Sequence, residues 1–408
     1  MSLNNTPSAE RIHIGIFGRR NTGKSSLINA LTGQNLSIVA DIKGTTTDPV
    51  LKAMELLPLG PVVMIDTPGL DDTGSLGQLR IQKTYQILNK TDIAILVLDS
   101  TTDITKEDQD ILQKIRDKSI PYIVVCNKAD QSADHLSFAL KTANILRILP
   151  EQALFVSAAT GSKIHELKEK LASLVPSEAS GRRIIGDLVH PGDFVVLVVP
   201  IDKAAPKGRL ILPQQQTIRD LLDTGATAIV VKETELKNTL NNLGQTPALV
   251  VTDSQVFSQV NALLPKDIPL TSFSILFARY KGSLETVVKG AKVLDTLKDN
   301  DTILICEGCT HHRQCDDIGT VKLPNWIQEY TKKQLHFEFT SGTEFPADLT
   351  KYRLIIHCGG CTLNEREMKY RLKCADDASV PITNYGTAIA YLKGILPRSI
   401  QIFTPFQK

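Results

Sequence analysis

Short apolar runs alternate with amphipathic stretches from the start of the chain to about residue 175. The runs Ile12–Phe17 and Pro121–Cys126 predict buried strands, and the stretch Ser26–Leu31 predicts a helix. Strands that alternate with helices are typical of a parallel sheet covered by helices. Residues 176–183 are small and polar, which indicates a linker. We therefore predict a first α/β domain over residues 1–176.

A second α/β block follows the linker, over residues 185–265. Its strands are predicted at 193–200, 226–231 and 247–252, with helices at 214–223 and 235–243. This block gathers no catalytic set of residues. A dimerisation module and a passive spacer therefore remain two open interpretations of it.

A third α/β block, residues 268–408, contains strands that each run into a loop rich in polar residues. These strands are predicted at 302–306, 353–357 and 381–383. The carboxyl ends of parallel strands share one crevice, where doubly wound sheets bind their ligands. We therefore expect His311 and His357, which lie near the ends of two of these strands, to come close in space. Both smaller domains are predicted to have mainly parallel sheets.

Four motifs in the first domain occur in the order typical of GTP-binding proteins. They are Gly18–Ser25, which fits the GxxxxGK[ST] phosphate loop, Asp66–Gly69, Asn127–Asp130 and Ser157–Ala159. The glycines of the phosphate loop let backbone N–H groups approach the phosphates. The Asp130 carboxylate can accept the two hydrogen bonds that guanine donates and adenine cannot. The sequence therefore predicts GTP rather than ATP as the nucleotide.

The nucleotide, Mg²⁺ and catalytic roles are assigned to residues of these motifs and of the segment between the first two. The predicted GTP-binding residues are Gly18, Asn21, Thr22, Gly23, Lys24, Ser25, Ser26, Asp66, Gly69, Asn127, Lys128, Asp130, Ser157, Ala158 and Ala159. Ser25, Thr46 and Asp66 are the predicted Mg²⁺ ligands, Asp66 acting through water. Lys24, Thr46 and Gly69 are the predicted catalytic residues, because Lys24 reaches the β- and γ-phosphates and the Gly69 amide senses the γ-phosphate.

Two positions in these motifs resemble the cation-activated branch of the TrmE-Era-like GTPases. Asn21 lies within the phosphate loop, and Leu70 follows Gly69 where Ras-like proteins place the glutamine that orients the attacking water. The resemblance implies that Asn21 helps to bind K⁺ beside the phosphates and that this ion activates hydrolysis. Residues 41–48, which include Thr46, are the predicted switch I. An alternative remains open in which Asn21 only caps the turn.

Composition and charge narrow the class of protein. The chain has 408 residues with 46 basic and 44 acidic side chains, so it has no net field to attract nucleic acid or a membrane. No apolar run approaches the roughly 20 residues that a membrane helix needs, and we expect a cytoplasmic protein. Seven cysteines, six of them after residue 300, indicate metal ligands in such a chain rather than a disulfide framework.

The last block carries the pattern Cys309-x-His311, followed later by His357-Cys358-x-x-Cys361. Together with the GTPase motifs and the middle block, this pattern resembles the HydF family of FeFe-hydrogenase maturation GTPases over the whole chain. The resemblance implies a homodimer that binds a 4Fe-4S cluster through Cys309, Cys358 and Cys361. It also implies that the chain receives a diiron precursor from radical-SAM maturases and transfers it to apo FeFe-hydrogenase.

Three cysteines leave one coordination position for another ligand. His311 and His357 are the main candidates for it, and the weaker ones are His312 and Asp316. Cys306 is a reserve ligand because it forms a CxxC pair with Cys309. Cys126 is expected to be a core residue, and the roles of Cys315 and Cys374 are open.

Two other functions are consistent with the same residues. Three cysteines and one histidine are an acceptable zinc set, so the chain could be a zinc-stapled GTPase in RNA or ribosome assembly. The balanced charge and an aromatic content of 5% oppose an RNA-binding role. A GTP-driven redox sensor is the other alternative.

Overall fold

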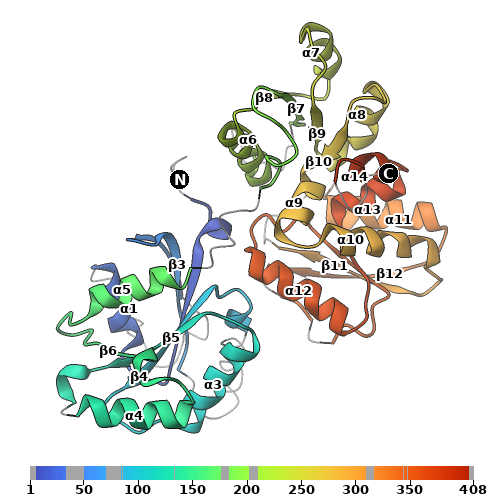
Figure 1. Cartoon of the computed structure of the whole chain (residues 1–408). Coiled ribbons are helices and arrows are strands. Elements are labelled where there is room, and N and C mark those ends of the chain that lie inside the picture. The colour runs from blue at the N-terminus through green and yellow to red at the C-terminus, as the bar shows by residue number, and fades with distance from the viewer. Residues whose placement is uncertain are drawn as a thin grey trace. The chain divides into compact units, whose positions relative to one another are not determined.

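The computed structural model describes residues 6–33, 50–69, 84, 86–132, 134–175, 183–201, 210–308, 317–342, 344–346 and 348–403. Several residues named by the sequence predictions lie outside this part of the chain: Thr46 with the rest of switch I, Leu70, Cys309, His311, His312, Cys315 and Asp316. The chain divides into two compact units, residues 1–179 and residues 180–408 (Figure 1).

The first unit is a six-stranded sheet with helices on both faces (Figure 1). In the order in which they pair, its strands are β2 (Val50–Leu56), β3 (Gly60–Asp66), β1 (Ile12–Phe17), β4 (Ile93–Asp99), β5 (Tyr122–Asn127) and β6 (Ala153–Phe155). All neighbouring strands are parallel except β2, which pairs antiparallel with β3. Within the described residues, the helices with both ends defined are α1 (Lys24–Thr32), α3 (Lys106–Asp117), α4 (His135–Leu146) and α5 (Ile164–Ser173).

Alternate residues of each central strand enter different hydrophobic cores, because successive side chains of a strand point to opposite faces. Ile95 of β4 packs in the core that contains Leu27 of α1. Its neighbour Leu96 packs in the core that contains Ile111 of α3. A strand buried on both faces has to be apolar at every position, which explains the continuous hydrophobic runs of the sequence.

The middle domain has a four-stranded parallel sheet. In pairing order its strands are β10 (Leu270–Ser272), β9 (Leu249–Thr252), β7 (Phe194–Val198) and β8 (Thr227–Val231). Its helices are α6 (Leu212–Thr224), α7 (Leu236–Asn242), α8 (Phe257–Leu263) and α9 (Phe273–Lys281).

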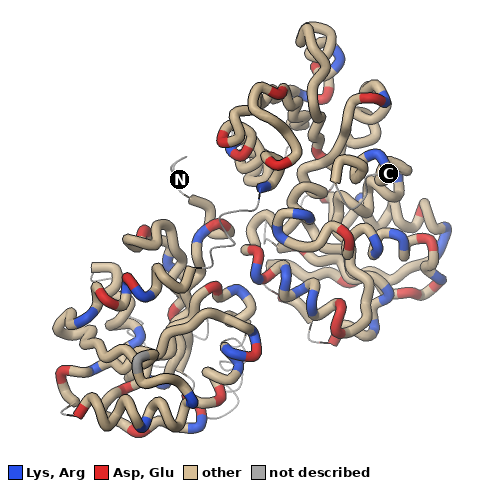
Figure 2. Tube along the Cα trace, in the orientation of Figure 1, with Lys and Arg blue, Asp and Glu red and all other residues tan. Residues whose placement is uncertain are grey.

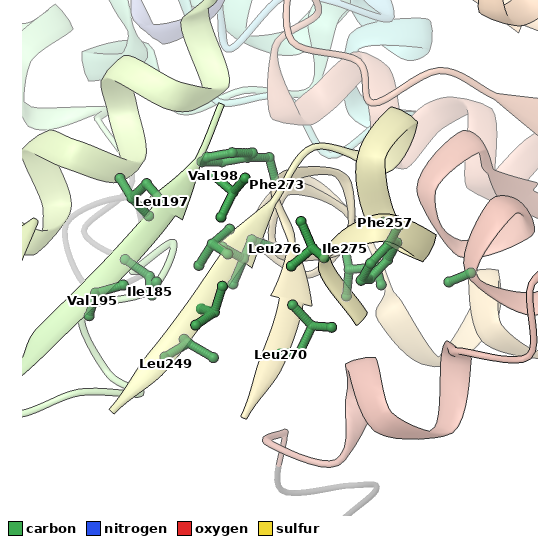
Figure 3. Close-up of a cluster of buried hydrophobic side chains, with 14 of the residues drawn as sticks. Ile185, Val195, Leu197, Val198, Leu249, Phe257, Leu270, Phe273, Ile275 and Leu276 are labelled. Atoms are coloured by element: carbon green, nitrogen blue, oxygen red, sulfur yellow. The ribbon is translucent and has the colours of Figure 1, made fainter. Parts of the chain in front are cut away.

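The position of β10 corrects the predicted boundary between the second and third domains. The sequence prediction began the last domain at residue 268, but the structure pairs Leu270 with Val250 of the middle sheet. The Leu270 side chain is fully buried, and Figure 3 shows it in the same cluster as Leu249 and Leu276. The apolar run around β10 is too short to indicate which sheet it joins. The sequence prediction therefore assigned it to the last domain.

The last domain has a second four-stranded parallel sheet. In pairing order its strands are β12 (His336–Ser341), β11 (Thr302–Glu307), β13 (Leu354–His357) and β14 (Ile382–Asn384). Its helices are α10 (Leu284–Ala291), α11 (Leu323–Thr331), α12 (Glu365–Asp377), α13 (Tyr385–Leu392) and α14 (Leu396–Ile400). The predicted fold class is therefore confirmed: a P-loop type α/β domain precedes two smaller α/β domains with parallel sheets.

The middle and last domains share one hydrophobic core. Helix α14 packs against β10, and α13 packs against α9. Leu396 and Phe403, near the end of the described chain, are buried in the same cluster as Val195 of β7. The second unit is compact for this reason, although it contains two sheets.

The charges of the described residues are mixed in sign along both units, as Figure 2 shows. The formal net charge of the chain is +2. Among the described residues, no helix combines the length and the apolar character needed to cross a membrane.

Candidate functional site

The loop between β1 and α1 requires glycine at both of its ends. Gly18 and Gly23 have φ values of 148° and 89°, in the region that favours glycine. A Cβ atom at Gly18 would lie 2.4 Å from the carbonyl oxygen of Val97, and one at Gly23 would lie 2.2 Å from Nδ2 of Asn127. Backbone alone can line such a cradle, and this property fits a bound phosphate.

Lys24 begins α1 and places its ammonium group on this loop. Its Nζ donates hydrogen bonds to the carbonyl oxygens of Gly18, at 2.9 Å, and Arg19, at 2.7 Å. The side chain is buried. The positive charge therefore lies at the loop where the sequence predicted it would meet the phosphates.

Ser25 and Asp66, two predicted Mg²⁺ ligands, lie against each other. The hydroxyl of Ser25 donates to Oδ2 of Asp66 at 2.9 Å. Burial raises the pKa of the Asp66 carboxyl, while the Ser25 hydrogen bond and the charge of Lys24 oppose the rise. The other oxygen, Oδ1, is buried without a hydrogen-bond partner in the described part of the chain. A buried carboxylate oxygen left without a partner, next to a hydroxyl, fits a divalent cation held by oxygen ligands.

Asn127 joins the phosphate loop to the predicted guanine pocket. Its Nδ2 donates to the carbonyl oxygen of Thr22 at 2.9 Å, and its Oδ1 accepts from the amide of Ala158 at 3.0 Å. Ser157 is buried, and its hydroxyl accepts the amide of Thr160 at 3.1 Å. One side chain thus holds three of the predicted motifs together.

Other predicted nucleotide residues lie at the surface around this framework. Asp130 is exposed on a short turn, Ala129–Gln131, whose first amide donates to the carbonyl oxygen of Val156 at 3.0 Å. Asn21 is exposed and has a φ of 60°. Ser25, Ser26 and Ala159 are also exposed, and Gly69 follows β3 at the end of a described segment.

The structure adds two acidic side chains that the sequence prediction missed. Asp99, the last residue of β4, lies 2.5 Å from Nζ of Lys128. Burial alone would raise the pKa of Asp99, but the hydrogen bonds from Lys128 and Thr101 lower it overall. Asp108 of α3 is fully buried and lies 3.1 Å from Nε of Arg19 in the phosphate loop. The sequence did offer one signal for Asp99. Its carboxylate ends strand β4, and the neighbouring strand β5 leads directly to Lys128.

The strand ends of the last domain converge as predicted. Cys306 of β11 is opposite His357 of β13, which is opposite Asn384 of β14. The predicted ligands Cys358 and Cys361 lie in the loop that leaves β13. The third predicted cysteine ligand, Cys309, follows β11 just outside the described residues.

Backbone N–H groups point at the sulfur of Cys358. Its Sγ accepts from the amide of Gly308 at 3.0 Å and from the amide of Gly360 at 3.4 Å. Hydrogen bonds of this kind stabilise a negatively charged thiolate, the form that binds metal. Burial raises the pKa of Cys361, and the charge of Lys281 opposes that rise. The described residues alone contain no group of three or more His, Cys, Asp or Glu side chains that could hold a metal ion, so the pair fits as half of a ligand set.

His357 is held by hydrogen bonds at both of its ring nitrogens. Its Nε2 lies 2.8 Å from Nη1 of Arg371, and because a guanidinium only donates, Nε2 accepts this hydrogen bond. Its Nδ1 therefore carries the proton and donates to the carbonyl oxygen of Cys358 at 2.8 Å. Burial and the charge of Arg371 lower the pKa of His357 to about 3, so the ring is neutral. Both ring nitrogens have hydrogen-bond partners, and the role of His357 as a cluster ligand stays a prediction.

Arg371 itself is fully buried on α12. Its Nε donates to Oε1 of Glu367 at 3.0 Å and its Nη2 donates to the carbonyl oxygen of Gly342 at 2.9 Å. The His357 ring is thus fixed by a buried ion pair, an arrangement that is costly to break because it would leave a charge without compensation. The sequence carried a signal for this pair in the spacing of Glu367 and Arg371, one helical turn apart.

The other described cysteines lie in or against hydrophobic clusters. Cys306 and Cys126 are fully buried in hydrophobic clusters, and burial raises the pKa of Cys306 to about 11 and that of Cys126 to about 12. The expectation of a core role for Cys126 is confirmed. The Cys306 side chain packs in a hydrophobic cluster that includes Ala375 of α12, and its reserve role as a ligand stays a prediction. Cys374 packs at the edge of the same cluster.

These two sites define a class of protein: a P-loop GTPase domain joined to two α/β domains, the last of which presents a cysteine pair at its strand ends. Sequence profiles of known families match the same three regions. They are the 50S ribosome-binding GTPase family at residues 13–128, the hydrogen maturase F dimerization domain at residues 184–282 and the hydrogen maturase F tetramerization domain at residues 285–402. The two maturase profiles together cover more than half of the chain. The chain belongs to the hydrogen maturase F (HydF) family.

Curated relatives match the GTPase region. The tRNA modification GTPase MnmE of Chromobacterium violaceum is 35% identical over 167 residues, which are 41% of this chain and 35% of the relative. GTPase Der of Wolinella succinogenes is 36% identical over 178 residues, 42% of this chain and 37% of the relative. The chain therefore spans little more than a third of the length of either relative.

Solved structures of GTPases also align with the chain. Era of Aquifex aeolicus bound to GDP and AlF4⁻ is 21% identical with a TM-score of 0.36, over 57% of this chain and 98% of that one. A probable GTP-binding protein, engB, is 24% identical with a TM-score of 0.35, over 40% of this chain and 98% of that one.

Proposed function

We propose that the chain is a GTPase scaffold that binds a 4Fe-4S cluster and a diiron precursor and transfers the precursor to apo FeFe-hydrogenase. One observation carries this proposal. The sulfur of Cys358 receives two backbone N–H groups at the strand ends of a domain that matches a hydrogen maturase profile. A thiolate that accepts two amide hydrogen bonds, with Cys361 three residues later in the same loop, is suited to hold an iron-sulfur cluster.

In the GTPase domain, each residue has a distinct role in this proposal. The ammonium of Lys24 exchanges its contacts with Gly18 and Arg19 for the β- and γ-phosphates of GTP. Ser25 and Asp66 would hold Mg²⁺, which neutralises phosphate charge when bound. Thr46 completes the Mg²⁺ ligands, and the Gly69 amide senses the γ-phosphate. The guanine base is read by Asp130.

In the last domain, Cys309, Cys358 and Cys361 would hold the cluster. A fourth, exchangeable position is then available for an incoming diiron unit, since a cluster with four cysteine ligands is coordinatively closed. His357 has both ring nitrogens engaged, so His311 is the histidine that we propose for this position. The partners are a second copy of the chain, radical-SAM maturases and the apo-hydrogenase.

The alternative of a zinc-stapled GTPase in RNA assembly is not favoured. The hydrogen maturase F tetramerization profile matches residues 285–402, the region that would carry the zinc. Metal analysis separates the two functions. Protein purified without oxygen is expected to be brown and to contain iron rather than zinc.

The proposal is tested by activating hydrogenase in a defined mixture. The chain, reconstituted with iron and sulfide and exposed to purified maturases, is mixed with apo-hydrogenase, and hydrogen evolution is measured with GTP and with a non-hydrolysable analogue. We expect activity that depends on the chain. Activity that is equal with and without it would contradict a carrier role, and the comparison of the two nucleotides shows whether hydrolysis drives the transfer or only times it.

Hydrolysis is expected to be faster in K⁺ than in Na⁺ at equal ionic strength. An amide oxygen from Asn21 and backbone carbonyls form a site suited to the larger ion, and this ion replaces the water-orienting side chain that Leu70 cannot supply. The rate of phosphate release in matched chloride salts measures the effect. Equal rates would leave activation to another source.

A substitution at Asn21 can separate a role in binding K⁺ from a role in the turn. Asparagine tolerates its φ of 60° better than most residues, so its presence has a conformational explanation as well. Asn21→Gly keeps the backbone conformation and removes the amide. Loss of the K⁺ preference in this variant assigns the amide to the ion, whereas a preserved preference assigns Asn21 to the turn alone.

A further inference from the structure

A buried lysine from the middle domain lies against the cysteine loop of the last domain. Lys281 is the last residue of α9 and its side chain is only 4% exposed. Helix α9 starts directly after β10 of the middle sheet, with Ser272 as its N-cap. Ile275 and Leu276 of this helix are fully buried in the core of that sheet (Figure 3). The packing of the middle domain therefore determines where Lys281 lies.

The ammonium of Lys281 binds three carbonyl oxygens of one loop. Its Nζ donates to Leu363 at 2.8 Å, to Gly360 at 3.2 Å and to Cys361 at 3.2 Å. The loop turns sharply here, since Gly360 has a φ of 61°. The same turn directs the Gly360 amide to the sulfur of Cys358. Three hydrogen bonds to one cation thus fix the turn that separates the two cysteines.

Lys281 also places a positive charge beside the cysteine pair. A cluster held by thiolates becomes more negative when it is reduced, and nearby charge is one of the factors that set its reduction potential. The ammonium donates to the carbonyl oxygen of Cys361, the same residue whose sulfur is a proposed thiolate ligand. The geometry therefore combines a mechanical and an electrostatic contact in one side chain.

We propose that Lys281 is a positioning residue of the cysteine centre, which fixes the loop from Cys358 to Leu363, favours the reduced cluster and ties the centre to the middle domain. This inference rests on the proposed function, because it takes the centre to hold an iron-sulfur cluster. It involves a residue outside the cysteine motif and outside the domain that carries it. A change in the middle domain that moves the end of α9 would move the loop with it.

The test uses the full chain with Lys281→Met, which removes the charge and the donors, and Lys281→Arg, which keeps the charge. Lys289→Met is the matched control, because Lys289 is exposed on α10 and pairs with Glu285. In the metal-free protein, we expect amide hydrogen exchange of residues 358–363 to accelerate about tenfold or more in Lys281→Met. Exchange in β7 and β9 should stay as in the wild type.

In the iron-loaded protein, Lys281→Met is expected to have a lower midpoint potential and an altered electron paramagnetic resonance spectrum. Lys281→Arg should restore the potential most of the way, and Lys289→Met should change neither quantity. Unchanged exchange and potential in Lys281→Met would overturn the inference. Faster exchange spread over the whole middle sheet would also overturn it, because Lys281 would then be a general stability residue.

The measurements on the metal-free and on the iron-loaded protein test this inference separately from the proposed function. If the wild-type chain holds no iron, the proposed function fails, while the exchange measurement still decides whether Lys281 fixes the loop. If the wild-type chain holds iron and the Lys281 variants match it in exchange and potential, only the inference fails.

Discussion

Cys358→Ala is expected to abolish iron loading and hydrogenase maturation while GTP hydrolysis continues at the wild-type rate. The substitution removes the sulfur to which the amides of Gly308 and Gly360 point. The nucleotide residues lie in the other compact unit, so their chemistry does not depend on this sulfur. Iron per chain and the rate of phosphate release, measured on the same preparation, check both parts of the expectation.

Cys374→Ala is the matched control for this prediction. Cys374 lies on α12 at the edge of a hydrophobic cluster, so its loss should leave iron loading unchanged. Cys361→Ala and Cys309→Ala should behave like Cys358→Ala. Wild-type iron content in the Cys358 variant would mean that this cysteine is not a ligand.

Asp130→Asn is expected to move the base preference from guanine toward xanthine. The carboxylate accepts two hydrogen bonds from guanine, and an amide replaces one acceptor with a donor. Hydrogen bonds to a charged group contribute about 1.5–3 kcal/mol each, so the preference for GTP should fall on the order of 10²-fold. Competition between GTP and XTP for the purified variant measures the change.

Lys24→Ala separates base recognition from phosphate binding in the same assay. It should weaken the binding of both GTP and XTP and leave the ratio of their affinities unchanged, because Lys24 lies at the phosphate loop and not at the base. If Asp130→Asn kept the original ratio of GTP to XTP affinity, the guanine pocket would have to be placed elsewhere.

The sequence predicted the structure best at positions where only one type of residue satisfies the local physical requirement. Glycine at positions 18 and 23 is required by the backbone and by close contacts, so the motif predicted the loop together with its neighbours. The strands buried on both faces were recognisable for a similar reason. Strand β12 was not predicted, because it is an edge strand whose side chains are largely exposed and it contains no apolar run.

Roles that depend on a distant partner could not be predicted. His357 looked like a ligand because it precedes Cys358, and only the fold shows that Arg371 occupies its second nitrogen. Cys306 looked like half of a CxxC pair, but strand alternation turns its side chain into the core. Lys281 carried no signal at all, since its importance comes from carbonyl groups that lie about 80 residues later in the chain.

The shared core of the second unit limits how its two domains can be dissected. Leu396 and Phe403 end the described chain in the last domain, yet they are buried in the cluster that contains Val195 of the middle sheet. A chain shortened before residue 396 would therefore leave a hole in the core of the middle domain, although the deleted residues belong to the last domain. Separating the two domains would expose this shared apolar surface to water, so we expect each domain alone to be less stable than the intact unit.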